Sequence, residues 1–216
     1  MKKFFALLLI ALLSGCVPPP KDYTKFNAAN VRSLLIIPVV NRSVDVTAPD
    51  YFLSTMPIPL AEHGYYVFPV NMVKRLLEDD GLSDADLVHS APAERLGELF
   101  GADAILYVCI EKWDAKYMLL STQVTVELSY LIKDGSTGEE LWQHREAMVY
   151  VPQNSSSGNP LVDLIAMAVT AAVTKAAPNY MPLAQQANAK AFAYPGAGVP
   201  PGPYYKEPGV SGVGPR

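Results

Sequence analysis

The chain has 216 residues, half of them hydrophobic, and a formal net charge of -4 at pH 7. It contains no run of lysine and arginine, which a nucleic-acid-binding surface needs to displace counterions, so the composition argues against nucleic acid as a partner. The length is enough for one domain that buries a sizeable core.

The first sixteen residues have the parts of a secretory signal. Two lysines precede an apolar run over residues 4–13, and small residues follow it. An apolar run of about ten residues is too short to span a bilayer, so it indicates a signal peptide over residues 1–15 rather than a transmembrane helix.

Leu13, Ser14, Gly15 and Cys16 resemble the lipobox of bacterial lipoproteins. The resemblance implies that the peptide before Cys16 is removed, that the Cys16 thiol receives a diacylglycerol, and that the new amino terminus is acylated, for example with palmitate. Three acyl chains exceed what stable membrane anchoring needs. Val17, in place of aspartate, implies the periplasmic face of the outer membrane rather than inner-membrane retention. The alternative is an ordinary cleaved signal with a chance cysteine.

Both ends of the mature chain are predicted to be tails. Residues 16–30 contain three consecutive prolines and several polar side chains, which predicts a semi-extended tether. Residues 181–216 end in a stretch rich in proline and glycine, which predicts a disordered tail, with a tyrosine-containing docking peptide as the alternative. The folded periplasmic domain is therefore expected over residues 31–180.

Six elements are predicted in the first part of this domain. The first is a continuous apolar run whose lack of polar alternation indicates a strand buried on both faces. Apolar spacings of three and four residues, followed by glycine, indicate helices. In chain order the predicted strands are 33–40, 65–68 and 104–110, and the predicted helices are 50–60, interrupted by prolines, 70–79 and 92–100.

A hairpin and one helix complete the domain. Residues 123–132 alternate polar and apolar side chains, residues 141–150 are the partner strand, and the connection 133–139 supplies the glycines of a hairpin. The order of elements predicts an α/β fold, with a mixed β-sheet of about five strands packed by helices.

The last predicted helix, over residues 160–176, is apolar nearly all round. Its surface must be covered by the sheet, by a second copy of the protein or by lipid, since the helix is too short to span a bilayer. The candidate interaction residues on it are Leu161, Leu164, Ile165 and Met167.

The sequence holds no motif typical of catalysis or metal binding. His63, His89 and His144 lie far apart, and neither a phosphate-binding glycine motif nor a nucleophile motif is present. After acylation of the lipobox cysteine, Cys109 is the remaining thiol, and its apolar neighbours predict a small buried residue on a strand. Asp103 is expected to cap the turn before that strand. We therefore predict no catalytic residue, metal, cofactor or small-molecule substrate.

Several segments carry a family resemblance. Together with the lipobox, residues 34–38 (LLIIP), 96–106 (LGELFGADAIL) and 138–142 (GEELW) resemble a family of Gram-negative lipoproteins of the neisserial GNA type. The segment 96–106 also resembles periplasmic domains of the curli secretion lipoprotein CsgG, of the amino-terminal domain of TolB, and of the LpoB activators of cell-wall synthases. The resemblance implies a fold like the TolB amino-terminal domain.

The same resemblance implies an interaction module rather than an enzyme. It suggests a lipid-anchored assembly component of a CsgG-like envelope secretion system that forms a homo-oligomer and binds CsgG-like lipoproteins. The expected contact is the apolar last helix or the exposed edge of the sheet. The alternative is an LpoB-like regulator of peptidoglycan synthesis. An envelope hydrolase that uses His144 or Asp103 is a third hypothesis.

Overall fold

The structure is a computed structural model that describes residues 21–118, 121–150, 181–193 and 196–206. Its strands are β1 (Ser33–Ile36), β2 (Val40–Asn41), β3 (Tyr66–Val67), β4 (Ala104–Met118), β5 (Ser121–Asp134) and β6 (Glu140–Tyr150). Its helices are α2 (Thr24–Ala29), α3 (Ala48–Thr55), α4 (Pro57–Glu62), α5 (Val70–Asp79), α6 (Ala85–Ser90), α7 (Ala93–Phe100) and α9 (Met181–Ala193). No helix within these residues has the length and apolar character needed to cross a membrane.

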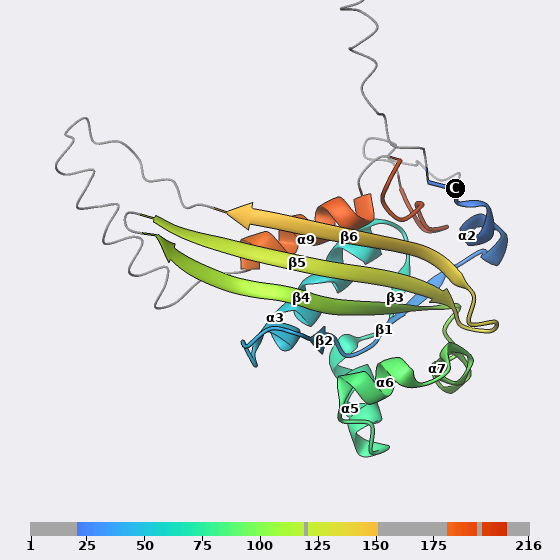
Figure 1. Ribbon diagram of the computed structural model, residues 1–216. Coiled ribbons are helices and arrows are strands. Elements are labelled where there is room, and N and C mark those ends of the chain that lie inside the picture. Colours follow the sequence, from blue (N-terminus) through green and yellow to red (C-terminus); the bar gives the residue numbers. More distant parts are fainter. Residues whose placement is uncertain (1–20, 119–120, 151–180, 194–195, 207–216) are drawn as a thin grey trace, which may run out of the picture.

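The strands form one mixed sheet, which confirms the predicted α/β fold (Figure 1). Five strands lie in the order β3-β1-β4-β5-β6, and β2 pairs with β4 beyond the end of β1. β1 runs parallel to β3 and β4, whereas β4, β5 and β6 are successive antiparallel neighbours. The sheet therefore has six strands rather than about five, because the run 33–40 is divided in two.

Proline explains that division. Pro38 has no backbone N–H to donate, so the pairing with β4 stops after Ile37, whose amide donates to the Leu106 carbonyl at 3.3 Å, and resumes at Val40. The prediction that this run is buried on both faces is confirmed, since Leu34 to Ile37 are all fully or almost fully buried.

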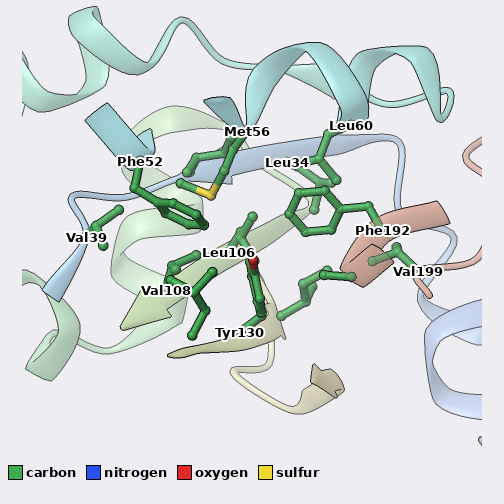
Figure 2. Close-up of a cluster of buried hydrophobic side chains, with 14 of the residues drawn as sticks. Leu34, Val39, Phe52, Met56, Leu60, Leu106, Val108, Tyr130, Phe192 and Val199 are labelled. Carbon is green, nitrogen blue, oxygen red and sulfur yellow. The ribbon is translucent and has the colours of Figure 1, made fainter. Parts of the chain in front are cut away.

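Helices cover both faces of the sheet near β1. On one face, α5, α6 and α7 pack against a cluster that includes Leu35, Ile37 and Ile105. On the other face, α2, α3, α4 and α9 enclose the larger core. Figure 2 shows part of that core. It contains Phe52 of α3, Met56 directly after α3, Phe192 of α9 and Tyr130 of β5. The two layers leave much of β5 and β6 uncovered on the α5 side (Figure 1).

The helix predictions are accurate where the end signals are strong. α5 has the predicted bounds, and α7 ends at Gly101, which adopts a left-handed conformation with φ of 67°. The predicted helix 50–60 is two helices, α3 and α4, because prolines start the second one. α6 was not predicted from the sequence; the Asp84 carboxylate caps it by accepting the amides of Asp86 and Leu87.

The tail predictions are wrong for the described parts of both tails. Residues from Thr24 to Ala29 of the predicted tether form α2, whose Phe26 is 4% exposed and lies edge-on to Tyr65. Of the predicted disordered tail, Met181–Ala193 form α9, and Val199 in the proline-rich segment is 3% exposed. Prolines and glycines prevented regular structure in that segment, but its apolar and backbone groups find partners on the folded domain.

The last three strands are longer than predicted. β4 continues to Met118, eight residues past the predicted end at Ile110. A bulge between Ile110 and Lys112 shifts the register, so that Ile110 and Trp113 are both buried in the same core. The shift breaks the period of two that identifies a strand in a sequence, which explains the early end of the prediction.

Candidate interaction surfaces

β6 is an edge strand with an outward row of backbone groups. The Gln143 carbonyl faces away from β5, since it accepts a hydrogen bond of 2.7 Å from Lys21 Nζ. In an antiparallel pair the outward groups recur at every second residue, so the N–H and C=O groups of Arg145, Ala147 and Val149 also face outward. The side chains of these three residues are exposed. Among the described residues no strand pairs with this side of β6, and an outward row of this kind can pair with a strand of another chain.

The sheet face beside this edge is polar. Ser129, whose hydroxyl donates to Glu111 Oε1 at 2.7 Å, pairs with Cys109 on one side and with Arg145 on the other. A groove runs over this face beside α6, and Lys133 lies over the ring of Tyr107 in it. The mixture of charges suits a hydrated surface or a polar protein contact rather than an apolar ligand.

Cys109 lies on β4 in this groove, as a strand residue was predicted to, but it is half-buried and not buried. Odd-numbered residues of this part of β4 face the α5 side, where Tyr107 is covered by the helices but Cys109 lies at their rim. Burial, with the nearby Glu111 carboxylate, raises the pKa of the Cys109 thiol to about 11. The group is therefore a neutral thiol at neutral pH.

Cys109 is expected to react slowly with maleimide or iodoacetamide although it is partly accessible. Only the thiolate is a nucleophile, and a pKa near 11 leaves roughly 300-fold less thiolate at pH 7.5 than the usual cysteine pKa of about 8.5 does. In a Cys16→Ala chain, where Cys109 is the single thiol, the rate should keep rising about tenfold per pH unit beyond pH 9. In urea, where the chain is unfolded, the rate should level off near pH 8.5. The same levelling off in the folded chain would contradict the prediction.

The three histidines occupy three separate places. His63 Nε2 lies 2.7 Å from the Val199 carbonyl and His89 Nε2 lies 2.9 Å from the Pro38 carbonyl, while His144 Nε2 lies 3.2 Å from Glu146. Burial lowers the pKa of His89, so this ring is neutral at neutral pH. Within the described ranges, no three His, Cys, Asp or Glu side chains gather in a way that could hold a metal ion.

Asp103 holds two strands together. Its Oδ2 accepts the amides of Arg32 and Ser33 at 3.0 and 2.9 Å, and its own amide donates to Ser33 Oγ at 2.9 Å. These bonds fix the start of β1 beside the start of β4. They join distant residues, whereas the sequence predicted a local cap of the turn before β4. The carboxylate is thus engaged in structural bonds.

The two ends of the described chain meet on one side of the domain. Residues 196–206 form a strap without regular structure, and the Tyr23 hydroxyl donates to the Gly198 carbonyl at 2.7 Å. Lys21 lies over the ring of Trp142, 4.7 Å from its centre. Figure 1 shows the start of the described chain beside this strap. We call Lys21, Tyr23 and the strap the terminal surface.

The lipobox and the candidate interaction residues of the last predicted helix are not among the residues that the structure describes. Leu13 to Cys16 precede residue 21, and Leu161, Leu164, Ile165 and Met167 fall between residues 150 and 181. An exposed sheet edge was expected as a contact, but the sequence did not indicate that β6 forms it. The alternation in 141–150 identifies its exposed side chains, but no local signal distinguishes an edge strand from a central one.

The chain is similar to known lipoproteins. A family model described as "Putative lipoprotein GNA1162-like" matches residues 21–203. The "Putative lipoprotein NMB1124/NMB1162" of Neisseria meningitidis serogroup B is 34% identical over 155 residues, which cover 70% of this chain and 72% of that protein. The crystal structure of lipoprotein GNA1162 from Neisseria meningitidis has a TM-score of 0.55 at 32% identity, over 68% of this chain and 99% of that chain.

A weaker similarity involves the LpoB C-terminal domain from Salmonella enterica. It has a TM-score of 0.40 at 21% identity, over 55% of this chain and 83% of that chain. A similarity at this level supports no functional comparison.

Proposed function

This chain belongs to the GNA1162-like lipoprotein family, and we propose that it is an outer-membrane lipoprotein that binds other envelope proteins and carries out no catalysis. Its partners are copies of itself and CsgG-like lipoproteins, and its role is assembly of an envelope secretion system. The lipid anchor is Cys16, at the end of the signal Leu13-Ser14-Gly15. The domain then stands on the periplasmic face of the membrane.

The edge of β6, with which no described strand pairs on its outer side, carries this proposal. Main-chain bonds to an added strand give affinity, and the alternate side chains give specificity. Here the outward groups at Arg145, Ala147 and Val149 present that template, and the polar face beside them supplies charged side chains for the contact.

Proline at position 147 tests this edge. Ala147→Pro removes one outward N–H but no bond to β5, and proline is tolerated on the solvent side of an edge strand. We expect crosslinks to partners in intact cells to fall at least tenfold, while the melting temperature changes little. Ala147→Thr keeps the N–H and is the matched control, which should retain the crosslinks. Equal crosslinking of both variants would exclude strand addition at β6.

The identity of the crosslinked partner tests the rest of the proposal. A CsgG-like pore or a homo-oligomer, lost in a Cys16→Ala chain that is not acylated, would support it, whereas recovery of a cell-wall synthase would favour the LpoB-like alternative.

We also propose Leu161, Leu164, Ile165 and Met167 as a second contact, from their apolar pattern alone. Charged substitutions at Leu164 and Met167 should then reduce the mass measured at micromolar concentration.

The length of the tether disfavours the LpoB-like alternative. Lys21 is already bound to the domain, so only five residue steps separate it from Cys16. Such a segment reaches about 17 Å when fully extended. A regulator that reaches through the cell wall from the outer membrane needs a much longer connection.

A further inference from the structure

We propose that the terminal surface faces the bilayer that holds the anchor and lies against its headgroups. The inference rests on the proposed acylation of Cys16 and adds an orientation to it. It concerns which side of the domain meets the membrane, and therefore which sides remain open to other proteins.

The length of the tether is the first argument. Lys21 is held in place twice, by its hydrogen bond to the Gln143 carbonyl and by its position over the Trp142 ring. The five steps from Cys16 to Lys21 span about 17 Å at most. The backbone of Lys21, and the side of the domain that carries it, therefore stay within about 17 Å of the acylated Cys16.

The chemistry of the strap is the second argument. Tyr204 and Tyr205 are 61% and 41% exposed, and Lys206 beside them is also exposed. Tyrosine is favoured at the level of the lipid headgroups, because its ring is amphipathic, and a neighbouring cation is attracted to anionic lipid. Lys25 of α2, four residues after Lys21, already pairs with Glu139 at 2.5 Å. The contact is therefore chiefly aromatic.

The strap is fixed in place, although it has no regular structure. The amides of Gly202 and Tyr204 donate to the carbonyls of His63 and Gly64 at 2.9 and 3.1 Å. The Tyr65 hydroxyl donates to the Pro200 carbonyl, and the Tyr205 ring lies 5.7 Å from the His63 ring. These contacts hold two tyrosines toward solvent on the side where the anchor joins the domain.

This orientation determines which surfaces of the domain remain accessible to other proteins. α5, α6 and α7 lie on the other face of the sheet from α2 and α9, with the sheet between them and the strap (Figure 1). β6 starts beside Lys21 and runs away from it, so its edge is accessible from the side. A partner that pairs with β6 would accordingly stand in, or next to, the same membrane.

Quenching of a fluorophore by lipid tests the orientation. The acylated full chain carries Cys109→Ser and one further cysteine labelled with NBD, either Tyr204→Cys in the strap or Asp79→Cys on α5, whose side chain is 61% exposed. In vesicles of phosphatidylethanolamine and phosphatidylglycerol with a headgroup nitroxide, we expect at least threefold stronger quenching at position 204 than at 79. Lys206→Cys provides a second strap position if Tyr204→Cys disturbs the strap.

Two results would overturn the proposal. One is equal quenching at 204 and 79, which means that the domain has no preferred orientation. The other is loss of quenching at 204 when unlabelled acylated protein is added, which means that a second copy covers the strap. Flotation of the protein with the vesicles is measured in parallel. Protein that floats with equal quenching refutes the orientation alone, whereas protein that does not float refutes the anchor.

Discussion

Gly97→Ala is expected to lower the free energy of unfolding by about 3 kcal/mol, although alanine favours helices. Gly97 lies in α7, where its backbone approaches the hairpin between β5 and β6. A Cβ atom at this position would lie 2.0 Å from the Gly135 carbonyl oxygen and 2.7 Å from the Gly135 Cα. Backbone atoms cannot move aside as the end of a flexible side chain can, so α7 would have to shift away from the sheet.

The sign of this effect makes it informative. In a solvent-exposed helix, replacing glycine by alanine stabilises by roughly 0.5–1 kcal/mol. At Gly97 the clash must therefore cost more than this gain for the substitution to lower the free energy of unfolding. Urea unfolding followed by circular dichroism gives the free energy and shows whether the slope is unchanged.

Gly101→Ala is the matched control. Gly101 ends the same helix with φ of 67°, but a Cβ there would meet no atom within 4 Å. Only the strain of the left-handed conformation remains, which costs about 1–2 kcal/mol. If Gly97→Ala is milder than Gly101→Ala, the close approach of α7 to the hairpin is not a constraint on the fold.

Asn188→Ala is the second substitution with a large expected effect, and it should destabilise the domain by about 2–4 kcal/mol. Asn188 is fully buried in α9. Its Oδ1 accepts from the Tyr130 hydroxyl at 3.0 Å, and its Nδ2 donates to Thr55 Oγ1 at 2.8 Å. The amide thus links α9 to β5 and to α3, and alanine would leave the Tyr130 hydroxyl without its acceptor in the core.

Apolar replacement of both partners tests whether the cost comes from the unpaired hydroxyl. Tyr130→Phe combined with Asn188→Leu removes donor and acceptor together, so the pair should cost less than the sum of the two single changes by about 1–2 kcal/mol. Gln186→Ala, at an exposed position of α9, should change the stability by less than about 0.5 kcal/mol. Strict additivity in thermal unfolding would show that the hydrogen bond does not couple the two residues.

Local patterns in the sequence were sufficient for much of the α/β layout. The apolar spacing in 70–79 and the glycine after Phe100 predict α5 and the end of α7, because a helix end depends on nearby residues. The hairpin between β5 and β6 is likewise local, since Gly135 and Gly138 supply its turn. The family resemblance also rests on such segments, and the comparisons confirm it.

For features that depend on distant residues, the predictions from the sequence were wrong or were not made. The proline-rich strap has no pattern of its own, and its order comes from backbone bonds to His63 and Gly64, far away in the chain. The bulge after Ile110 hides the second half of β4. The half-exposed state of Cys109 depends on where the helices stop covering the sheet.

The sequence by itself determined the membership of a lipoprotein family and the alternation of strands and helices, because both depend on residues close together in the chain. For the same reason it predicts a signal that ends in Cys16. Only the tertiary structure decided that β6 is the last strand of the sheet among the described residues, and that Tyr23 and the strap meet on one side of the domain. Strand order and the docking of an irregular segment arise from contacts between distant residues, which no local periodicity encodes.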